Sequence, residues 1–152
     1  MKVLKDIGGM EMKIEQVGSR LKVIQNKLEE LKEHGGVINE LEYDRENSEQ
    51  SFKADNYLRA LDMLGDVNAI LEWLEKPIVA EGVLVKNAGG RYQIDGTDVE
   101  FTSGRPLDVW HYDDWKEKES WTRSRVEHGN GDYYIVALGK DVSIEGLKVR
   151  TR

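Results

Sequence analysis

The hydrophobic pattern of this chain changes its period at Pro77. Before Pro77, apolar residues recur at helical intervals; after it, short runs rich in β-branched and aromatic residues alternate between glycine-containing turns. Pro77 also disfavours the helical conformation of Lys76 and so ends the helical part. The pattern predicts an α+β protein, with a helical hairpin over residues 1–76 and a small β-barrel over residues 77–152.

The first helix is expected over residues 10–34. Its apolar residues are spaced by alternating steps of 4 and 3, which is the a/d pattern of a heptad repeat. The glycines at Gly35 and Gly36 predict a C-terminal cap. We expect this apolar seam to act in association, and its residues are Met10, Ile14, Val17, Leu21, Ile24, Leu28 and Leu31.

The second helix is expected over residues 48–76. Asn47 to Gln50 has the form of a capping box, in which the asparagine side chain accepts a backbone N–H and the glutamine reaches back. Two helices of similar length joined by a connection predict an antiparallel hairpin. The seam of the first helix could be buried by self-association into a four-helix bundle, giving a homodimer, or by packing on the barrel.

Five or six short strands follow Pro77, with no helical period between them, and they predict a small SH3-like antiparallel barrel. The strongest local signal is Asn130-Gly131, which predicts a two-residue type I′ hairpin turn. The run from Tyr133 to Leu138 is apolar on both faces. We therefore expect it to be a strand covered by the barrel core on one side and by the helices on the other.

Composition excludes several classes of site. The chain has no cysteine, so it has neither disulfides nor thiolate metal ligands, and a cytoplasmic location is expected. No signal peptide or membrane span is evident near the N-terminus. The net charge of -7 argues mildly against non-specific nucleic-acid binding. Most of the acidity lies in residues 1–78, which hold 11 basic and 16 acidic residues.

Short motifs in the C-terminal part resemble a family of small uncharacterised proteins from low-GC Gram-positive bacteria, often found on prophages and conjugative elements. The resemblance covers roughly residues 70–152 and implies a bacterial, mobile-element context but no catalytic residue. Phe101 stands where the family pattern has leucine. The motifs are Glu81-Gly82-x-Leu84-x-Lys86-Asn87, Gly90-Arg91-Tyr92, Thr102-Ser103-Gly104, Trp121-x-x-Ser124-Arg125-Val126-Glu127-His128, Tyr133-Tyr134 and Gly146-Leu147-x-Val149-Arg150.

Basic side chains on two predicted strands form the first candidate site. Period-two alternation places Arg123 and Arg125 on one strand face, and Lys148, Arg150 and Arg152 on one face of the last strand. If these strands are neighbours, the five cations form one patch for phosphate or an acidic partner. Alternatively, the cations pair with carboxylates such as Glu127 or Glu100, or with the acidic helices, on a solvated face.

Aromatic residues form a second candidate site. Trp110 and Trp121 belong to a set of eight aromatics in residues 79–152, and exposed aromatics of small barrels can bind proline-rich peptides or nucleobases. The alternative role is packing in the core or between domains. A weaker cluster of His111, Asp113 and Asp114, which Glu127 and His128 could extend, could hold a metal or act in catalysis.

No recognisable catalytic, metal-binding or cofactor-binding motif is present. The sequence therefore favours a non-enzymatic interaction or adaptor protein that uses no cofactor or metal. It would associate through its helices and contact a protein partner through Arg123, Arg125, Lys148, Arg150, Trp110 and Trp121. The alternative is a nucleic-acid-binding accessory protein of a mobile genetic element; no membrane partner is expected.

Overall fold

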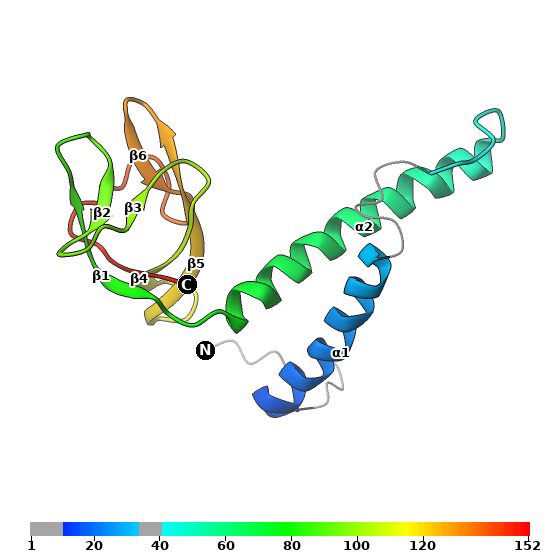
Figure 1. The fold of residues 1–152 in the computed structure, drawn as a ribbon, viewed down its shortest axis with the longest axis horizontal. Coiled ribbons are helices and arrows are strands. Elements are labelled where there is room, and N and C mark those ends of the chain that lie inside the picture. Colours follow the sequence, from blue (N-terminus) through cyan, green and yellow to red (C-terminus); the bar gives the residue numbers. More distant parts are fainter. Residues whose placement is uncertain (1–10, 34–40) are drawn as a thin grey trace. The chain divides into compact units, whose positions relative to one another are not determined.

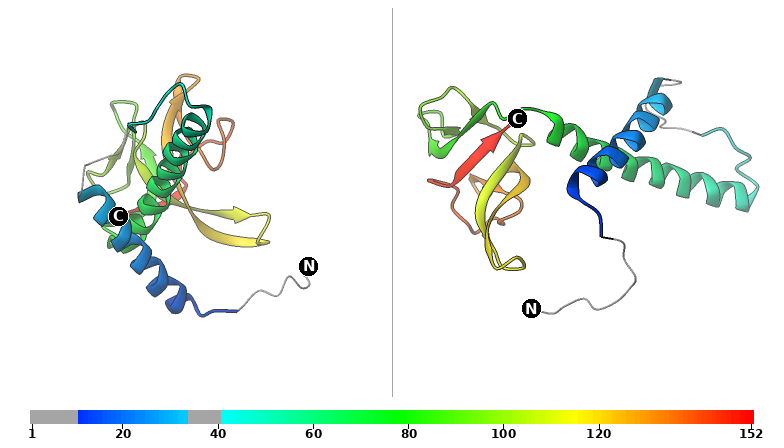
Figure 2. Two further views of the ribbon diagram at one scale, coloured as in Figure 1. Left: turned by 90° about the vertical axis from the view of Figure 1, so that its right-hand side faces the viewer. Right: turned by 90° about the horizontal axis from the view of Figure 1, so that it is seen from below.

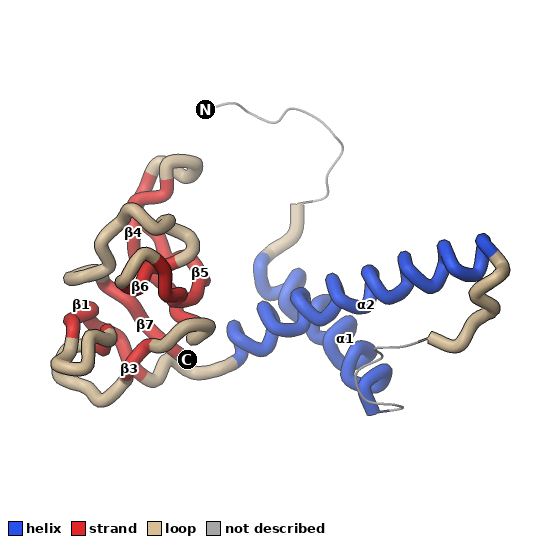
Figure 3. The backbone as a smooth tube through the Cα atoms, turned by 90° about the horizontal axis from the view of Figure 1, so that it is seen from above, coloured by secondary structure: helices blue, strands red, loops and turns tan. Residues whose placement is uncertain are grey.

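The computed structural model describes residues 11–33 and 41–152 (Figure 1). The chain divides into two compact units, Met1–Glu75 and Lys76–Arg152. The first contains two helices and the second a seven-stranded antiparallel sheet, drawn blue and red in Figure 3. This confirms the α+β class. Neither of the described helices is long and apolar enough to cross a membrane.

Helix α1 (Ile14–Glu33) begins four residues later than the pattern predicted. The Lys13 carbonyl accepts the N–H groups of Gln16 and Val17, and Gln16 Oε1 accepts the Lys13 N–H, so the helix is capped at this point. Met10 and the predicted cap at Gly35 and Gly36 lie outside the described residues. Of the predicted seam, Leu21 and Leu28 are half-buried, whereas Ile14, Val17, Ile24 and Leu31 are exposed.

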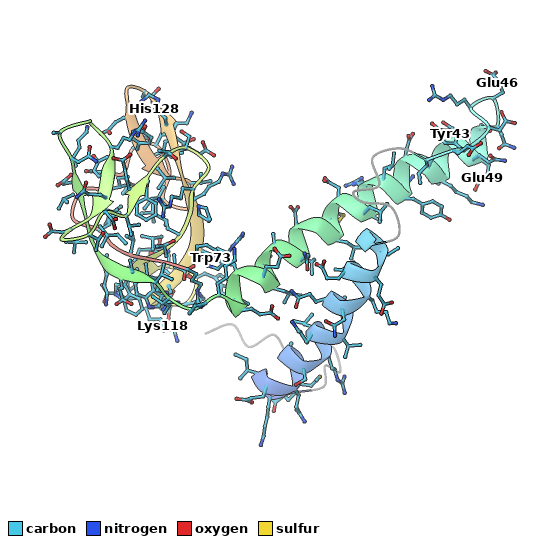
Figure 4. All side chains as sticks on the ribbon, in the orientation of Figure 1. Tyr43, Glu46, Glu49, Trp73, Lys118 and His128 are labelled. Atoms are coloured by element: carbon cyan, nitrogen blue, oxygen red, sulfur yellow. The ribbon has the colours of Figure 1, made fainter. Side chains whose placement is uncertain are left out.

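Helix α2 (Ser48–Glu75) starts at the predicted cap, but the capping box is only half formed. Asn47 Oδ1 accepts the N–H groups of Glu49 and Gln50 at 3.1 Å each. Gln50 Oε1 instead accepts the Asp44 N–H, because the Asn47 N–H already donates to the Asp44 carbonyl. Figure 4 labels Tyr43, Glu46 and Glu49 around this end of the helix.

Polar contacts connect α1 to α2. Lys22 Nζ lies 2.6 Å from Glu75 Oε1, and Asn68 Nδ2 donates to Glu29 Oε1 at 3.3 Å. Gln25 and Asn68 are buried, and Asn68 Oδ1 accepts no hydrogen bond from a described residue. These contacts between α1 and α2 are therefore polar, and the half-buried seam residues Leu21 and Leu28 lie on the same side of α1 as buried Gln25.

The sheet consists of two three-stranded meanders joined by the last strand of the chain. Strand β7 pairs with β1 on one side and with β4 on the other, so the sheet order is β3-β2-β1-β7-β4-β5-β6, with every pair antiparallel. The strands are β1 (Ala80–Lys86), β2 (Tyr92–Ile94), β3 (Glu100–Phe101), β4 (Pro106–Asp113), β5 (Lys118–Gly129), β6 (Asp132–Ile135) and β7 (Lys148–Thr151).

The sheet curls into a half-barrel because β1 and β5 each change partners along their length. The first half of β1 pairs with β7 and its second half with β2; most of β5 pairs with β4, and its end pairs with β6. Figure 2 shows the resulting curvature and the β4–β5 hairpin, drawn in yellow. Gly82 lies in β1 at the bend, where an added Cβ would be 2.8 Å from Ile94 Cγ2. Only glycine fits at this position without displacing the Ile94 side chain.

The core lies on the concave side of the half-barrel and receives alternate residues from each meander. Its buried members are Leu84, Tyr92, Ile94, Phe101, Leu107, Val109, Val126, Ile135, Ile144 and Val149. Side chains also connect the two meanders: Asp132 Oδ1 lies 3.1 Å from Lys86 Nζ, and Tyr92 Oη donates to Asp132 Oδ2 at 3.3 Å.

The predicted Asn-Gly turn is confirmed, because Asn130 and Gly131 join β5 to β6 with φ values of 56° and 80°. The predicted strand from Tyr133 to Leu138 is wrong beyond Ile135. The N–H groups of Leu138 and Gly139 both donate to the Ile135 carbonyl, so the chain turns there. Strand β6 is thus a short edge strand, and the central position belongs to β7.

Candidate binding surface

The convex face of β1, β7, β4 and β5 carries a row of alternating charges. Register places Glu81 opposite Arg150, Arg150 opposite Asp108, and Asp108 opposite Arg123. Opposite charges on directly paired strands stabilise a sheet. The row therefore places two carboxylates among the cations that the sequence analysis assigned to a binding patch.

Asp108 is the buried member of this row. Arg150 Nε lies 2.8 Å from Asp108 Oδ2 and Arg152 Nε lies 3.5 Å from the same atom. The Asp108 side chain is 6% exposed and the Arg150 side chain 18% exposed. Arg152 Nη1 also donates to the Lys76 carbonyl at 2.9 Å. Arg150 and Arg152, two of the five cations of the predicted patch, therefore form ion pairs with one buried carboxylate.

The next row along the sheet is aromatic and cationic. Trp110 and Trp121 face each other across β4 and β5 with ring centroids 5.2 Å apart in an edge-to-face arrangement. Arg150 Cζ lies 4.3 Å from the Trp121 ring centroid, and Lys148 Nζ lies 5.4 Å from it. Such contacts attract a cation to the electron-rich ring face. Lys148 also pairs with Glu81 at 3.0 Å. The two indoles thus serve as a platform for the cations.

Arg123 and Arg125 lie beside a hollow at the β4–β5 edge of this face. The hollow has a volume of about 450 Å³ and is lined by Gly104, Pro106, Arg123, Ser124, Arg125, Val136 and Ala137. Arg125 Nε lies 2.8 Å from Glu127 Oε1, and the Arg125 side chain is 56% exposed. The hollow combines positive charge with small apolar side chains, which suits an acidic group carried on a compact chain segment.

The structure places six predicted site residues on one face of the sheet, although the strands that carry them are not arranged as predicted. They are Arg123, Arg125, Lys148, Arg150, Trp110 and Trp121. Strands β5 and β7 are not neighbours, since β4 lies between them and contributes Asp108. Arg125 pairs with Glu127, as one interpretation of the sequence proposed, whereas Arg150 and Lys148 pair with Asp108 and Glu81. The sequence signal for Asp108 was a lone carboxylate within the apolar run Leu107-Asp108-Val109-Trp110.

The cluster around His111 does not converge on a single point. His111 Nε2 is hydrogen-bonded to Thr122 Oγ1 at 2.9 Å, and Asp113 Oδ1 accepts the N–H groups of Trp115 and Lys116 at the β4–β5 turn. The Lys116 N–H is the main reason that the pKa of Asp113 is lowered. His128 lies at the other end of β5 from Lys118 (Figure 4) and contacts Tyr133 edge-to-face. Among residues 11–33 and 41–152, no group of three His, Asp or Glu residues could hold a metal ion.

Trp115, one of the eight aromatics of the second candidate site, lies at the tip of the β4–β5 hairpin. Its side chain is 87% exposed, and the turn that carries it is fixed by Asp113 and by the Lys116–Asp113 ion pair at 3.2 Å. Tyr112 on the adjoining strand is also exposed. The turn thus presents a large, exposed aromatic side chain at the tip of the hairpin.

Comparison with known families adds one match, and it covers the sheet. Residues 82–151 are similar to a domain of unknown function, DUF5348. This confirms the predicted resemblance of the C-terminal part to an uncharacterised family. The DUF5348-like region includes β2 to β7 entirely and β1 from Gly82 onward, so it contains the whole candidate surface except Glu81 and Arg152. No curated protein and no solved structure was found to match the chain.

Proposed function

We propose that this protein is a non-enzymatic interaction protein, in which the helical unit mediates association and the DUF5348-like sheet contacts a partner. The main observation that supports this proposal is the large number of apolar side chains exposed along both helices. They are Ile14, Val17, Val23, Ile24 and Leu31 on α1, and Phe52, Tyr57, Met63, Val67, Ile70 and Leu74 on α2. Exposed apolar side chains that gather on one helix face, as Met63, Val67, Ile70 and Leu74 do on α2, mark interaction sites.

The test compares the full-length protein with a variant carrying Val67→Ser and Ile70→Ser. Both side chains are exposed, so their replacement should leave the helix content and the unfolding midpoint nearly unchanged. Association should be lost, measured as self-association by sedimentation and as quantitative capture of other proteins by the immobilised chain. Equal behaviour of the variant and the wild type in both assays would overturn the proposal.

On the sheet, the proposed partner is acidic. Arg125 and Lys148 keep half-exposed side chains beside the hollow and the tryptophan pair, so a carboxylate-bearing segment could compete with Glu127 and Glu81 for them. Tryptophan fluorescence titrated with a polyglutamate peptide should report binding that weakens in Arg125→Ala. The exposed Lys140→Ala, elsewhere in the chain, is the control. This part of the proposal fails if both variants bind as the wild type does.

Nucleic-acid binding, with the mobile-element role that the sequence resemblance implies, is the second candidate. It is favoured by the presence of five cations and two tryptophans on one sheet face, but Glu81, Asp108 and Glu127 offset much of that charge. If this role is correct, DNA or RNA oligonucleotides should bind with affinity that falls steeply with salt, and Arg125→Ala with Arg150→Ala should weaken it. Absence of binding at low salt would exclude it. The SH3-like assignment and the cytoplasmic location stay predictions.

A further inference from the structure

Helix α2 carries a second apolar seam that its contact with α1 does not use. Met63, Val67, Ile70 and Leu74 follow one another at steps of 4, 3 and 4, and they are between 38% and 60% exposed. This is an a/d pattern, the one that packs against another helix. The α2 residues that contact α1, Asn68 and Glu75, lie on a different face.

The seam on α1 is accompanied by a basic row. Lys13, Arg20 and Lys27 recur every seven residues, and each immediately precedes a seam residue: Ile14, Leu21 and Leu28. All three cations are exposed. In a heptad with Ile14, Leu21 and Leu28 at position a, these cations occupy position g, where charges select the partner helix.

The seam on α2 is accompanied by an acidic row. Asp62 and Asp66 immediately precede Met63 and Val67, and Asp55 lies seven residues before Asp62. All three aspartates are exposed, and Arg59 on the same side leaves the row with a net charge of -2. The α1 seam is thus flanked by positive charge and the α2 seam by negative charge.

Within one chain these two seams do not face each other, because the α2 residues that contact α1, Asn68 and Glu75, lie on another face of α2. The exposed part of the α1 seam consists of Ile14, Val17, Ile24 and Leu31, whereas Leu21 and Leu28 are half-buried. Pairing two α1 seams antiparallel would place the cations of one basic row against those of the other. Pairing α1 of one chain with α2 of another joins opposite charges, and it occurs twice in a twofold-symmetric dimer.

We propose that the occupant of these seams is a second copy of this chain, docked so that the basic-flanked α1 seam of each copy packs on the acidic-flanked α2 seam of the other. This inference rests on the proposed role of the helices in association and names the partner. The resulting contact buries both apolar seams in one closed assembly.

The test uses charge reversal in the full-length protein. One variant carries Lys13→Glu, Arg20→Glu and Lys27→Glu; the other carries Asp62→Lys and Asp66→Lys. Sedimentation equilibrium should show a wild-type dimer, and each variant alone should raise the dimer Kd by roughly tenfold or more. An equimolar mixture of the two should recover the wild-type Kd, since each variant helix then meets a complementary partner.

The matched control carries Ser19→Glu and Asn26→Glu, which place added acidic charge on exposed α1 positions away from the seam. It should dimerise as the wild type does, and circular dichroism should show equal helix content in every variant. A monomeric wild type overturns the inference. A dimer whose Kd changes in neither charge-reversal variant also overturns it, and so does a mixture of the two variants that fails to recover the wild-type Kd. A monomer whose capture of another protein is lost with Val67→Ser and Ile70→Ser would overturn the dimer alone. A wild type that neither dimerises nor captures another protein would overturn the proposed function too.

Discussion

Arg150 Nε lies 2.8 Å from Asp108 Oδ2 across the β7–β4 ladder, and both side chains are largely buried. Asp108 also faces Arg123 across β4 and β5 and lies within ion-pair distance of Arg152. Asp108 is therefore the carboxylate shared by the largest number of cations on the convex face, and with Glu81 and Glu127 it makes this face a balanced network of charges.

Asp108→Asn should lower the free energy of unfolding by about 3 kcal/mol, because it leaves a largely buried guanidinium without its counter-charge. Urea denaturation followed by tryptophan fluorescence measures the change. The comparison is Glu127→Gln, which breaks the more exposed pair with Arg125 and should cost about 0.5 kcal/mol. Equal effects of the two substitutions would show that Asp108 has no special role.

Gly82→Ala should destabilise the sheet by roughly 1–3 kcal/mol, since the new Cβ would meet the fully buried Ile94 side chain at 2.8 Å. The cost should shrink when the Ile94 side chain is truncated to alanine, which a double-mutant cycle measures. Gly65→Ala in α2 is the control: nothing lies within 4 Å of the added Cβ, and the substitution should be stabilising. An uncoupled cycle would contradict the close-packing argument.

Gly131→Ala should cost roughly 1–2 kcal/mol, because residue 131 has a φ of 80°, where a Cβ is strained. Asn130→Gly, at the neighbouring position with a φ of 56°, should change stability by less than about 0.5 kcal/mol. Thermal unfolding of both variants tests the type I′ turn. The reverse order of stabilities would be incompatible with it.

Acid should destabilise the sheet through Asp132. The backbone N–H of Tyr133 and the ammonium group of Lys86 lower the pKa of Asp132 in the folded state. A lowered folded pKa means that its stabilising contribution is complete above the unfolded pKa and is lost as the pH falls through the folded pKa.

Asp132→Asn should therefore lower the free energy of unfolding at neutral pH and make that free energy fall less steeply as the pH decreases. Urea unfolding midpoints measured from neutral pH downward test both effects. Glu100 and Asp113, whose pKa values are also lowered, should keep part of the slope in the variant. An unchanged slope would show that Asp132 does not join the two meanders energetically.

Asn68→Leu should stabilise the helical unit by about 1 kcal/mol, because Asn68 is buried and its Oδ1 accepts no hydrogen bond from a described residue. Buried polar groups at helix contacts commonly fix register at the expense of stability. Circular dichroism on heating measures the gain. Loss of stability would instead mean that the bonds from Asn68 to Glu29 and Glu72 are net stabilising.

Local patterns in the sequence determined the local structure. The change of period at Pro77 separates helices from strands, Asn47 caps α2, and Asn130-Gly131 forms its turn, because each depends on the conformational preferences of a few adjacent residues. Alternation likewise placed Arg123 and Arg125 on one face of β5, and Lys148 and Arg150 on one face of β7, since the period of a strand is fixed by its backbone.

Strand order was decided only by the tertiary structure. Alternation cannot tell which strands pair, so the sequence alone did not predict that β7 inserts between β1 and β4, or that Asp108 comes between Arg123 and Arg150. The same holds for α1, where the heptad defined the seam but did not predict that Leu21 and Leu28 would be half-buried beside Gln25 while Ile14, Val17, Ile24 and Leu31 stay exposed. Charge balance and exposure depend on partners distant in the chain, and those partners are chosen by packing the whole fold.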